Sequence, residues 1–328
     1  MFIPTKGDII ELWKVIESLV DKPAHIKFNY AVLKNRKLLE NEIKTLEELS
    51  KPSEEFIEFE SERYRICSDY SEKDQNGSPI LENGVFKIKE DLRDECNSKL
   101  LELRDKYINT ILEREDQSRT FEINILNEPS DIQLYKVESQ FVPNNLNVSD
   151  LASLYFMIDE ELETKEITLT FQDLLYFWTA LKELGDFVSP ENFNFIKALA
   201  YNYNVVRPMI FSIEKDHLPR EEYFQYERKL SDLQRRHADT TESGTPKLMP
   251  NGAFIINEHI QEYQQDLEQL QNEYKYVIEY RNNQINHINR LMNENLTIKI
   301  VKVNIENFPN TLTPKNLQWL YPMVEDLE

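Results

Sequence analysis

The chain has 328 residues, of which 40% are hydrophobic and 30% charged, a composition that predicts a folded protein with room for two domains and excludes a disordered one. Its 38 basic and 59 acidic residues give a formal net charge of −21, which disfavours direct binding to nucleic acid because affinity for phosphate backbones comes from lysine and arginine. The two cysteines, Cys67 and Cys96, predict no disulfide framework, and no apolar run is long enough to span a membrane.

The opening segment of the chain recurs in its second half. Asp8-Ile-Ile-Glu-Leu-Trp13 aligns with Asp173-Leu-Leu-Tyr-Phe-Trp178, and a proline follows each segment. We therefore expect a short amphipathic helix over residues 8–20 and another over residues 173–184. The next matches lie 167 positions apart and continue without a gap for almost sixty residues.

Two further helices are expected in each half. The first covers residues 27–49 in the first copy. The next begins at Pro52-Ser-Glu-Glu-Phe56, which recurs as Pro219-Arg-Glu-Glu-Tyr223. Proline is tolerated in the first turn of a helix, and the two glutamates favour its positive N-terminus.

The start of this third helix is an acidic and aromatic run. Its functional interpretation is a negatively charged face that binds a basic surface of a partner protein. The alternative is an ordinary amphipathic helix with Phe56 and Phe59 in the core and solvated carboxylates. The candidate partner-binding residues are Glu54, Glu55, Glu58, Glu60 and Glu62.

A β-hairpin is expected after the third helix of each copy. Asn83-Gly84 in the first copy and Asn251-Gly252 in the second lie between short apolar runs. Asn-Gly is typical of two-residue hairpin turns, because both turn residues need positive φ.

A long helix is expected next, over residues 89–115 and 258–292. The alternating segments 121–125 and 296–300 then predict a strand in each copy, whose pairing partner the pattern leaves open. Aligning these two strands implies about eight extra residues in the second copy, so we expect the second arm to be longer by roughly 12 Å.

The closing segments also match, Leu151 to Asp159 with Leu317 to Glu325. Each could dock a partner or pack onto its own domain. Together the matches predict a mainly α protein with small β elements (α+β). It would have two tandem repeats, residues 1–163 and 164–328, each a helical hairpin or coiled coil with a β-hairpin between its long helices and a C-terminal strand. This outline resembles that of prefoldin subunits.

No catalytic motif accompanies the repeats. The sequence contains no phosphate-binding loop, dinucleotide fingerprint, nucleophile elbow or zinc-protease motif. Its five histidines are scattered. We expect no enzymatic activity, no cofactor and no bound metal.

Four motifs of the first half recur in a known family: the opening from Gly7 to Pro23, a Tyr-x-x-x-Lys-Asn helix at Tyr30 to Asn35, a Glu-Lys-Asp-x-x-Gly step at Glu72 to Gly77 and an apolar Met-Ile-Asp ending at Asp159. On these motifs the first half, and more weakly the second, resembles a family of small, uncharacterised proteins encoded by tailed bacteriophages. The resemblance implies a phage origin, and it supplies no catalytic residue.

These observations lead to a functional expectation. The chain would be a non-enzymatic phage protein that binds another protein, as an assembly factor or as a modulator or inhibitor of a host or defence component. The alternatives are a DNA mimic that inhibits a nucleic-acid-binding protein and a structural or packaged virion component. We expect a host or phage protein partner, no direct nucleic-acid or membrane binding, and a place in the bacterial cytoplasm or the virion. A homo-oligomer is also compatible.

Overall fold

The computed structural model describes residues 3–241, 244, 246–249 and 252–325. These residues are mainly helical with a few short strands, which confirms the predicted fold class at that level. The chain divides into two compact units. Unit 1 contains Met1–Leu49, Glu122–Leu218 and Asn282–Glu328, and unit 2 contains Ser50–Phe121 and Pro219–Arg281. Each unit therefore takes segments from both halves of the chain.

The opening helices of the two halves begin in the same way. Thr5 caps α1 (Lys6–Leu19) and Thr170 caps α7 (Phe171–Glu183). In both, the threonine side chain accepts a hydrogen bond from the backbone N–H of an aspartate three residues later, and that carboxylate accepts one from the threonine N–H. Such a reciprocal cap satisfies two donors that a helix start would leave unpaired.

Asn35 and Asn202 hold equivalent backbone segments in the two halves. Asn35 lies on α2 (Ile26–Ser50) and Asn202 on α8 (Phe193–Asp216). The Asn35 amide donates to the carbonyl of Tyr135 at 2.9 Å, and its oxygen accepts from the N–H of Tyr135 at 2.7 Å. Asn202 makes the same two bonds with Val301, at 2.9 and 2.8 Å. Each fully buried asparagine thereby ties its helix to a segment distant in sequence.

The strands of unit 1 are short and pair in twos. β3 (Val137–Glu138) pairs in parallel with β4 (Ile158–Asp159), and β7 (Val303–Asn304) pairs in parallel with β8 (Val324–Glu325). The longer strands β5 (Lys165–Thr170) and β6 (Asn295–Ile300) are antiparallel. The predicted strand at residues 296–300 is thus present, and β5 is its partner.

The predicted strand at residues 121–125 is wrong. These residues form η2 (Phe121–Ile125), a π-helical continuation of α5 (Ile108–Thr120). The segment alternates polar and apolar residues, but Phe121 and Ile125 are also four positions apart and so share one face of a helix. Five residues are too few to separate the two periodicities.

The core of unit 1 is one apolar cluster built from both halves. It includes Leu12 and Ile16 of α1 and Leu174 and Phe177 of α7. It also includes residues of the two closing segments, which are α6 (Val148–Leu154) with η4 (Tyr155–Met157) and α12 (Pro314–Leu320) with η7 (Tyr321–Met323). The first closing segment packs against α1 of its own half and against α8 of the second half.

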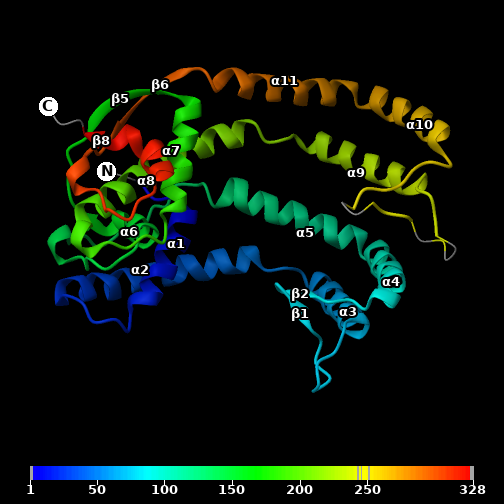
Figure 1. The fold of residues 1–328 in the computed structure, drawn as a ribbon. Helices are drawn as coiled ribbons and strands as arrows, with labels where there is room; N and C mark the ends of the chain where they lie inside the picture. Colours follow the sequence, from blue (N-terminus) through cyan, green and yellow to red (C-terminus); the bar gives the residue numbers. More distant parts are fainter. Residues whose placement is uncertain (1–2, 242–243, 245, 250–251, 326–328) are drawn as a thin grey trace. The chain divides into compact units, whose positions relative to one another are not determined.

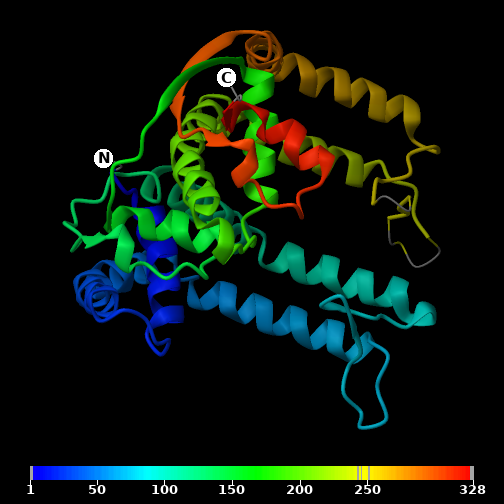
Figure 2. The same ribbon diagram turned by 60° about the vertical axis from the view of Figure 1, so that its left-hand side comes forward.

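Unit 2 contains two helical arms of the same construction. In the first, α3 (Glu54–Tyr70) packs against α4 (Arg93–Lys106) and α5. In the second, α9 (Glu221–Arg236) packs against α10 (Ile260–Glu273), which leads into α11 (Lys275–Leu291) (Figures 1 and 2). Phe59, Leu103 and Tyr107 form the centre of the first arm. Residues 167 positions later, Tyr226, Leu270 and Tyr274, pack together in the second.

The long helices differ from the prediction in two respects. Each is broken at a tyrosine, Tyr107 between α4 and α5 and Tyr274 between α10 and α11, with ψ of 19° and 15°. The ring of each tyrosine packs into the apolar cluster of its arm. The predicted difference in arm length is also wrong, because α4 and α10 have 14 residues each, and α5 continued by η2 ends at Ile125 whereas α11 ends at Leu291, an offset of 166. The apparent insertion came from aligning the helical residues 121–125 with a true strand.

A hairpin connects α3 to α4. β1 (Leu81–Glu82) and β2 (Val85–Phe86) are antiparallel, and Asn83 and Gly84 form the two-residue turn with φ of 51° and 81°. In the second arm, Leu248 and Phe254 form an antiparallel bridge around Gly252, whose φ is 83°. Asn251 lies outside the described residues.

Candidate protein-binding surfaces

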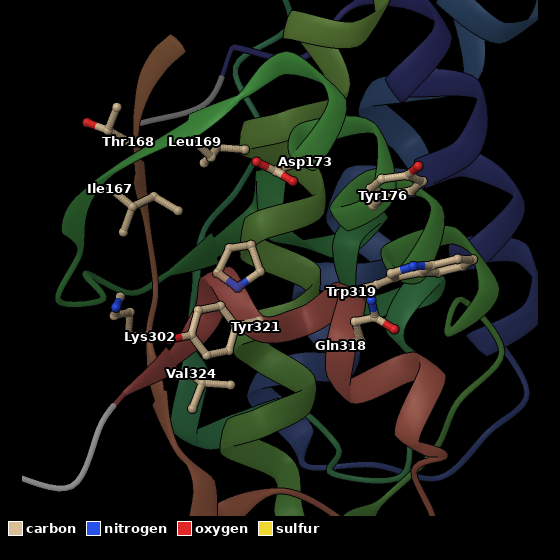
Figure 3. A pocket seen from close by; sticks show the side chains of 11 residues that line it. Ile167, Thr168, Leu169, Asp173, Tyr176, Lys302, Gln318, Trp319, Tyr321 and Val324 are labelled. Atoms are coloured by element: carbon tan, nitrogen blue, oxygen red, sulfur yellow. The ribbon is translucent and has the colours of Figure 1, made fainter. Parts of the chain in front are cut away.

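Unit 1 carries a groove of about 600 Å³ between its C-terminal segment and α7 (Figure 3). β5 forms one wall, the start of α7 another, and α12 with η7 a third. The residues that line it are Ile167, Thr168, Leu169, Asp173, Tyr176, Lys302, Gln318, Trp319, Tyr321, Pro322 and Val324.

Three aromatic residues, Tyr176, Trp319 and Tyr321, line this groove. Tyr176 and Trp319 are stacked, with ring centroids 5.9 Å apart and an angle of 11° between their planes. The ammonium group of Lys315 lies 4.2 Å from the Trp319 ring centroid. Tyr321 is 66% exposed. Large, partly exposed aromatic rings are enriched at surfaces that bind other proteins.

The acidic residue that lines the groove, Asp173, takes part in the N-terminal cap of its own helix. Asp173 accepts a hydrogen bond from Thr170 Oγ1 at 2.6 Å as part of the helix cap. It therefore serves the helix cap of α7 as Asp8 serves that of α1.

The five predicted glutamates fall into different environments on α3. Glu55 accepts a hydrogen bond from Thr110 Oγ1 at 3.2 Å, and Glu62 accepts from Lys106 and from the Tyr107 hydroxyl, both at 2.9 Å. These bonds lower the pKa of Glu62. Glu60 pairs with Arg63 at 2.7 Å. Glu54 and Glu58 are exposed. Phe56 and Phe59 pack inside the arm, as the amphipathic interpretation expected.

The outer face of α3 combines exposed apolar and acidic side chains. Ile57 is 53% exposed and Tyr64 is also exposed, and helical spacing places both on the side opposite Phe59. Glu54 lies one turn before Ile57, and Glu58 lies beside it. We call Glu54, Ile57, Glu58 and Tyr64 the outer face of α3.

The corresponding face of α9 contacts an arginine of the first arm. Glu221 and Phe224, at the positions of Glu54 and Ile57, hold Arg119 of the first arm. The guanidinium of Arg119 lies 2.8 Å from the Glu221 carboxylate and 4.4 Å from the Phe224 ring centroid. Further along, Arg235 donates to both carboxylate oxygens of Asp105, at 2.7 and 2.9 Å, and lowers the pKa of Asp105.

The histidines among the described residues form local pairs: His237 Nε2 lies 2.9 Å from the Asp266 carboxylate, and the His217 and His287 ring centroids are 5.3 Å apart. No three His, Cys, Asp or Glu side chains among them are placed to hold a metal ion. Both cysteines are free, and burial raises the pKa of each thiol, which disfavours the reactive thiolate. Within the same residues, no helix is both long and apolar enough to cross a membrane.

Comparisons with family models, with curated proteins and with solved structures found no match for this chain. The function is therefore inferred from the surfaces of the protein.

Proposed function

We propose that the protein is a non-enzymatic binding protein and that the outer face of α3 binds an arginine-bearing helix of another protein. The observation that carries this proposal is the use of α9. There, a glutamate and an apolar residue one turn apart hold Arg119 of a neighbouring helix. Glu54 and Ile57 repeat that arrangement on an exposed surface. An arginine can bury its apolar stem against Ile57 while its guanidinium pairs with Glu54.

The same proposal includes a tandem duplication and a phage origin. The duplication is supported by the paired asparagines, the two reciprocal helix caps and an ion pair whose charges are exchanged between arms. Lys106 contacts Glu62 at 2.9 Å in the first arm, and Lys229 contacts Glu273 at 2.7 Å at the matching positions of the second. In a phage, such a protein would serve as an assembly factor or as a modulator of a host or defence component.

The distribution of charge favours this function over a DNA mimic. A mimic needs an uninterrupted row of carboxylates that imitates phosphate spacing. On the first arm, basic side chains pair with the acids, as in Arg63 with Glu60 and Lys99 with Glu102. Such interleaving suits a protein surface of mixed charge better than a phosphate-like row.

Affinity capture from infected host cells tests the proposal. We expect the wild-type protein to retain a protein partner in stoichiometric amount, and the double variant Glu54→Arg, Ile57→Asp to lose it. The variant Glu268→Lys is the matched control, because Glu268 is exposed on α10 away from the outer face of α3. Both sets of changes are on the surface, where substitutions usually alter stability by less than about 0.5 kcal/mol.

The outcomes separate the alternatives. Recovery of no stoichiometric partner, or equal recovery with the double variant, would contradict the proposal. Displacement of the partner by duplex DNA would support the DNA mimic instead. A captured capsid or tail protein, together with structural copy numbers in purified particles, would identify a virion component.

A further inference from the structure

The first half of the chain has a surface that receives α8. Asn204 donates to the carbonyl of Ala152 at 2.8 Å, and the Tyr201 ring lies edge-on to Tyr155 with centroids 6.0 Å apart. Arg207 forms an ion pair with Asp8. With α8 in place, Tyr155 is only 6% exposed.

The groove in Figure 3 is the matching surface of the second half. Asp173 occupies the position of Asp8 at the third residue of its helix, and Tyr321 occupies that of Tyr155 at the start of the closing turn. Gln318 corresponds to Ala152. In the part of the chain that the structure describes, no helix occupies this surface as α8 occupies the first.

The helix that corresponds to α8 is α2, since Asn35 and Asn202 make equivalent bonds. The counterparts of Tyr201, Asn204 and Arg207 are therefore Lys34, Lys37 and Glu40. All three are exposed. The same face carries two exposed apolar side chains, Tyr30 and Leu33, the latter 54% exposed. α2 thus presents outward the face that α8 buries.

We propose that the groove binds α2 of a second copy of this chain, continuing the interface that α8 makes with the first half. The inference rests on the proposed duplication and is independent of the partner bound by α3. Each copy has one groove and one α2, so the contact is head-to-tail and leads to open chains or closed rings.

Of the three matched residues of α2, two would make favourable contacts with the groove and one would not. Lys34 would lie over the Tyr321 ring, a cation–π contact. Lys37 would reach the carbonyl of Gln318, as Asn204 reaches that of Ala152. Glu40 would face Asp173, where the first half has an arginine against an aspartate. This like-charge pair weakens the association and gives it a sharp test.

Sedimentation velocity over a concentration series measures the association. We expect the wild-type protein to self-associate reversibly and Glu40→Arg to strengthen the association about tenfold, because the variant restores the charge pair of the first half. Tyr321→Asp and Leu33→Asp should each abolish it alone. Mixed together, they should form a heterodimer, since each retains the face that the other lacks. Tyr276→Asp, a change at an exposed position of α11, is the matched control and should associate like the wild type.

Two results would contradict the proposed self-association. A wild-type protein and Glu40→Arg that both stay monomeric would overturn the proposal. So would a failure of the two face variants to combine, with far-ultraviolet circular dichroism showing that both are folded. None of these variants changes α3, so capture of a partner through α3 succeeds or fails independently.

Discussion

Replacing Asn202 by leucine is expected to lower the free energy of unfolding by about 2–4 kcal/mol. Leucine has nearly the same size, but the substitution leaves the N–H and carbonyl of Val301 without their partner, at a cost of about 1–3 kcal/mol for each buried group. Asn35→Leu should cost less, because its partner Tyr135 is 42% exposed and water can replace part of the interaction.

Urea unfolding followed by circular dichroism measures both values. Asn41→Leu, an exposed change on the same helix as Asn35, is the control and should alter stability by less than about 0.5 kcal/mol. If Asn202→Leu were as mild as the control, the two hydrogen bonds could not be holding α8 to the backbone at Val301 as the structure indicates.

The second large effect concerns the shared core of unit 1. Leu12→Ala and Phe177→Ala lie in different halves, yet both side chains are fully buried in one cluster. We expect each to destabilise the same cooperative transition, by about 2–5 kcal/mol for leucine and about 3–5 kcal/mol for phenylalanine. Leu103→Ala and Leu270→Ala should act instead on the arms of unit 2.

Hydrogen exchange read by mass spectrometry assigns each effect to its peptides. Under the expected result, Leu12→Ala speeds exchange in α8 as well as in α1, because one core holds both. Faster exchange confined to residues 1–163 would mean instead that each half folds by itself. The predicted repeats, residues 1–163 and 164–328, are defined by sequence similarity. Two similar sequence repeats can still contribute segments to one compact unit.

Much of the fold could be predicted from local sequence patterns. Helical spacing and the Asn83-Gly84 turn are set by neighbours within a few positions, and such signals were recognised in the sequence. The caps at Thr5 and Thr170 are equally local but were not predicted. The strand prediction for residues 121–125 was wrong because five alternating residues satisfy both helix and strand spacing. The breaks at Tyr107 and Tyr274 depend on rings packing against another helix, which no local pattern records.

The surfaces were harder to predict than the fold. The groove brings β5 and the adjoining α7 together with the closing segment, which lies more than one hundred positions later in the sequence, so its aromatic lining could not be predicted from either part alone. A comparison of matched positions offers one sequence signal, because the small apolar Ala152 of the first closing segment corresponds to the polar Gln318 of the second. The acidic run on α3 was visible, but which glutamates are paired depends on α4 and α5.

Site-specific photo-cross-linking from α3 tests the central claim most directly. A photoreactive amino acid is placed at Ile57 in one protein and, as the control, at the exposed Tyr276 in another, and both are irradiated in infected host cells. We expect a single covalent adduct with another protein from position 57, none from position 276, and loss of the adduct when Glu54 is changed to arginine. No adduct from position 57, or the same adducts from both positions, would contradict the claim that the outer face of α3 binds a protein partner.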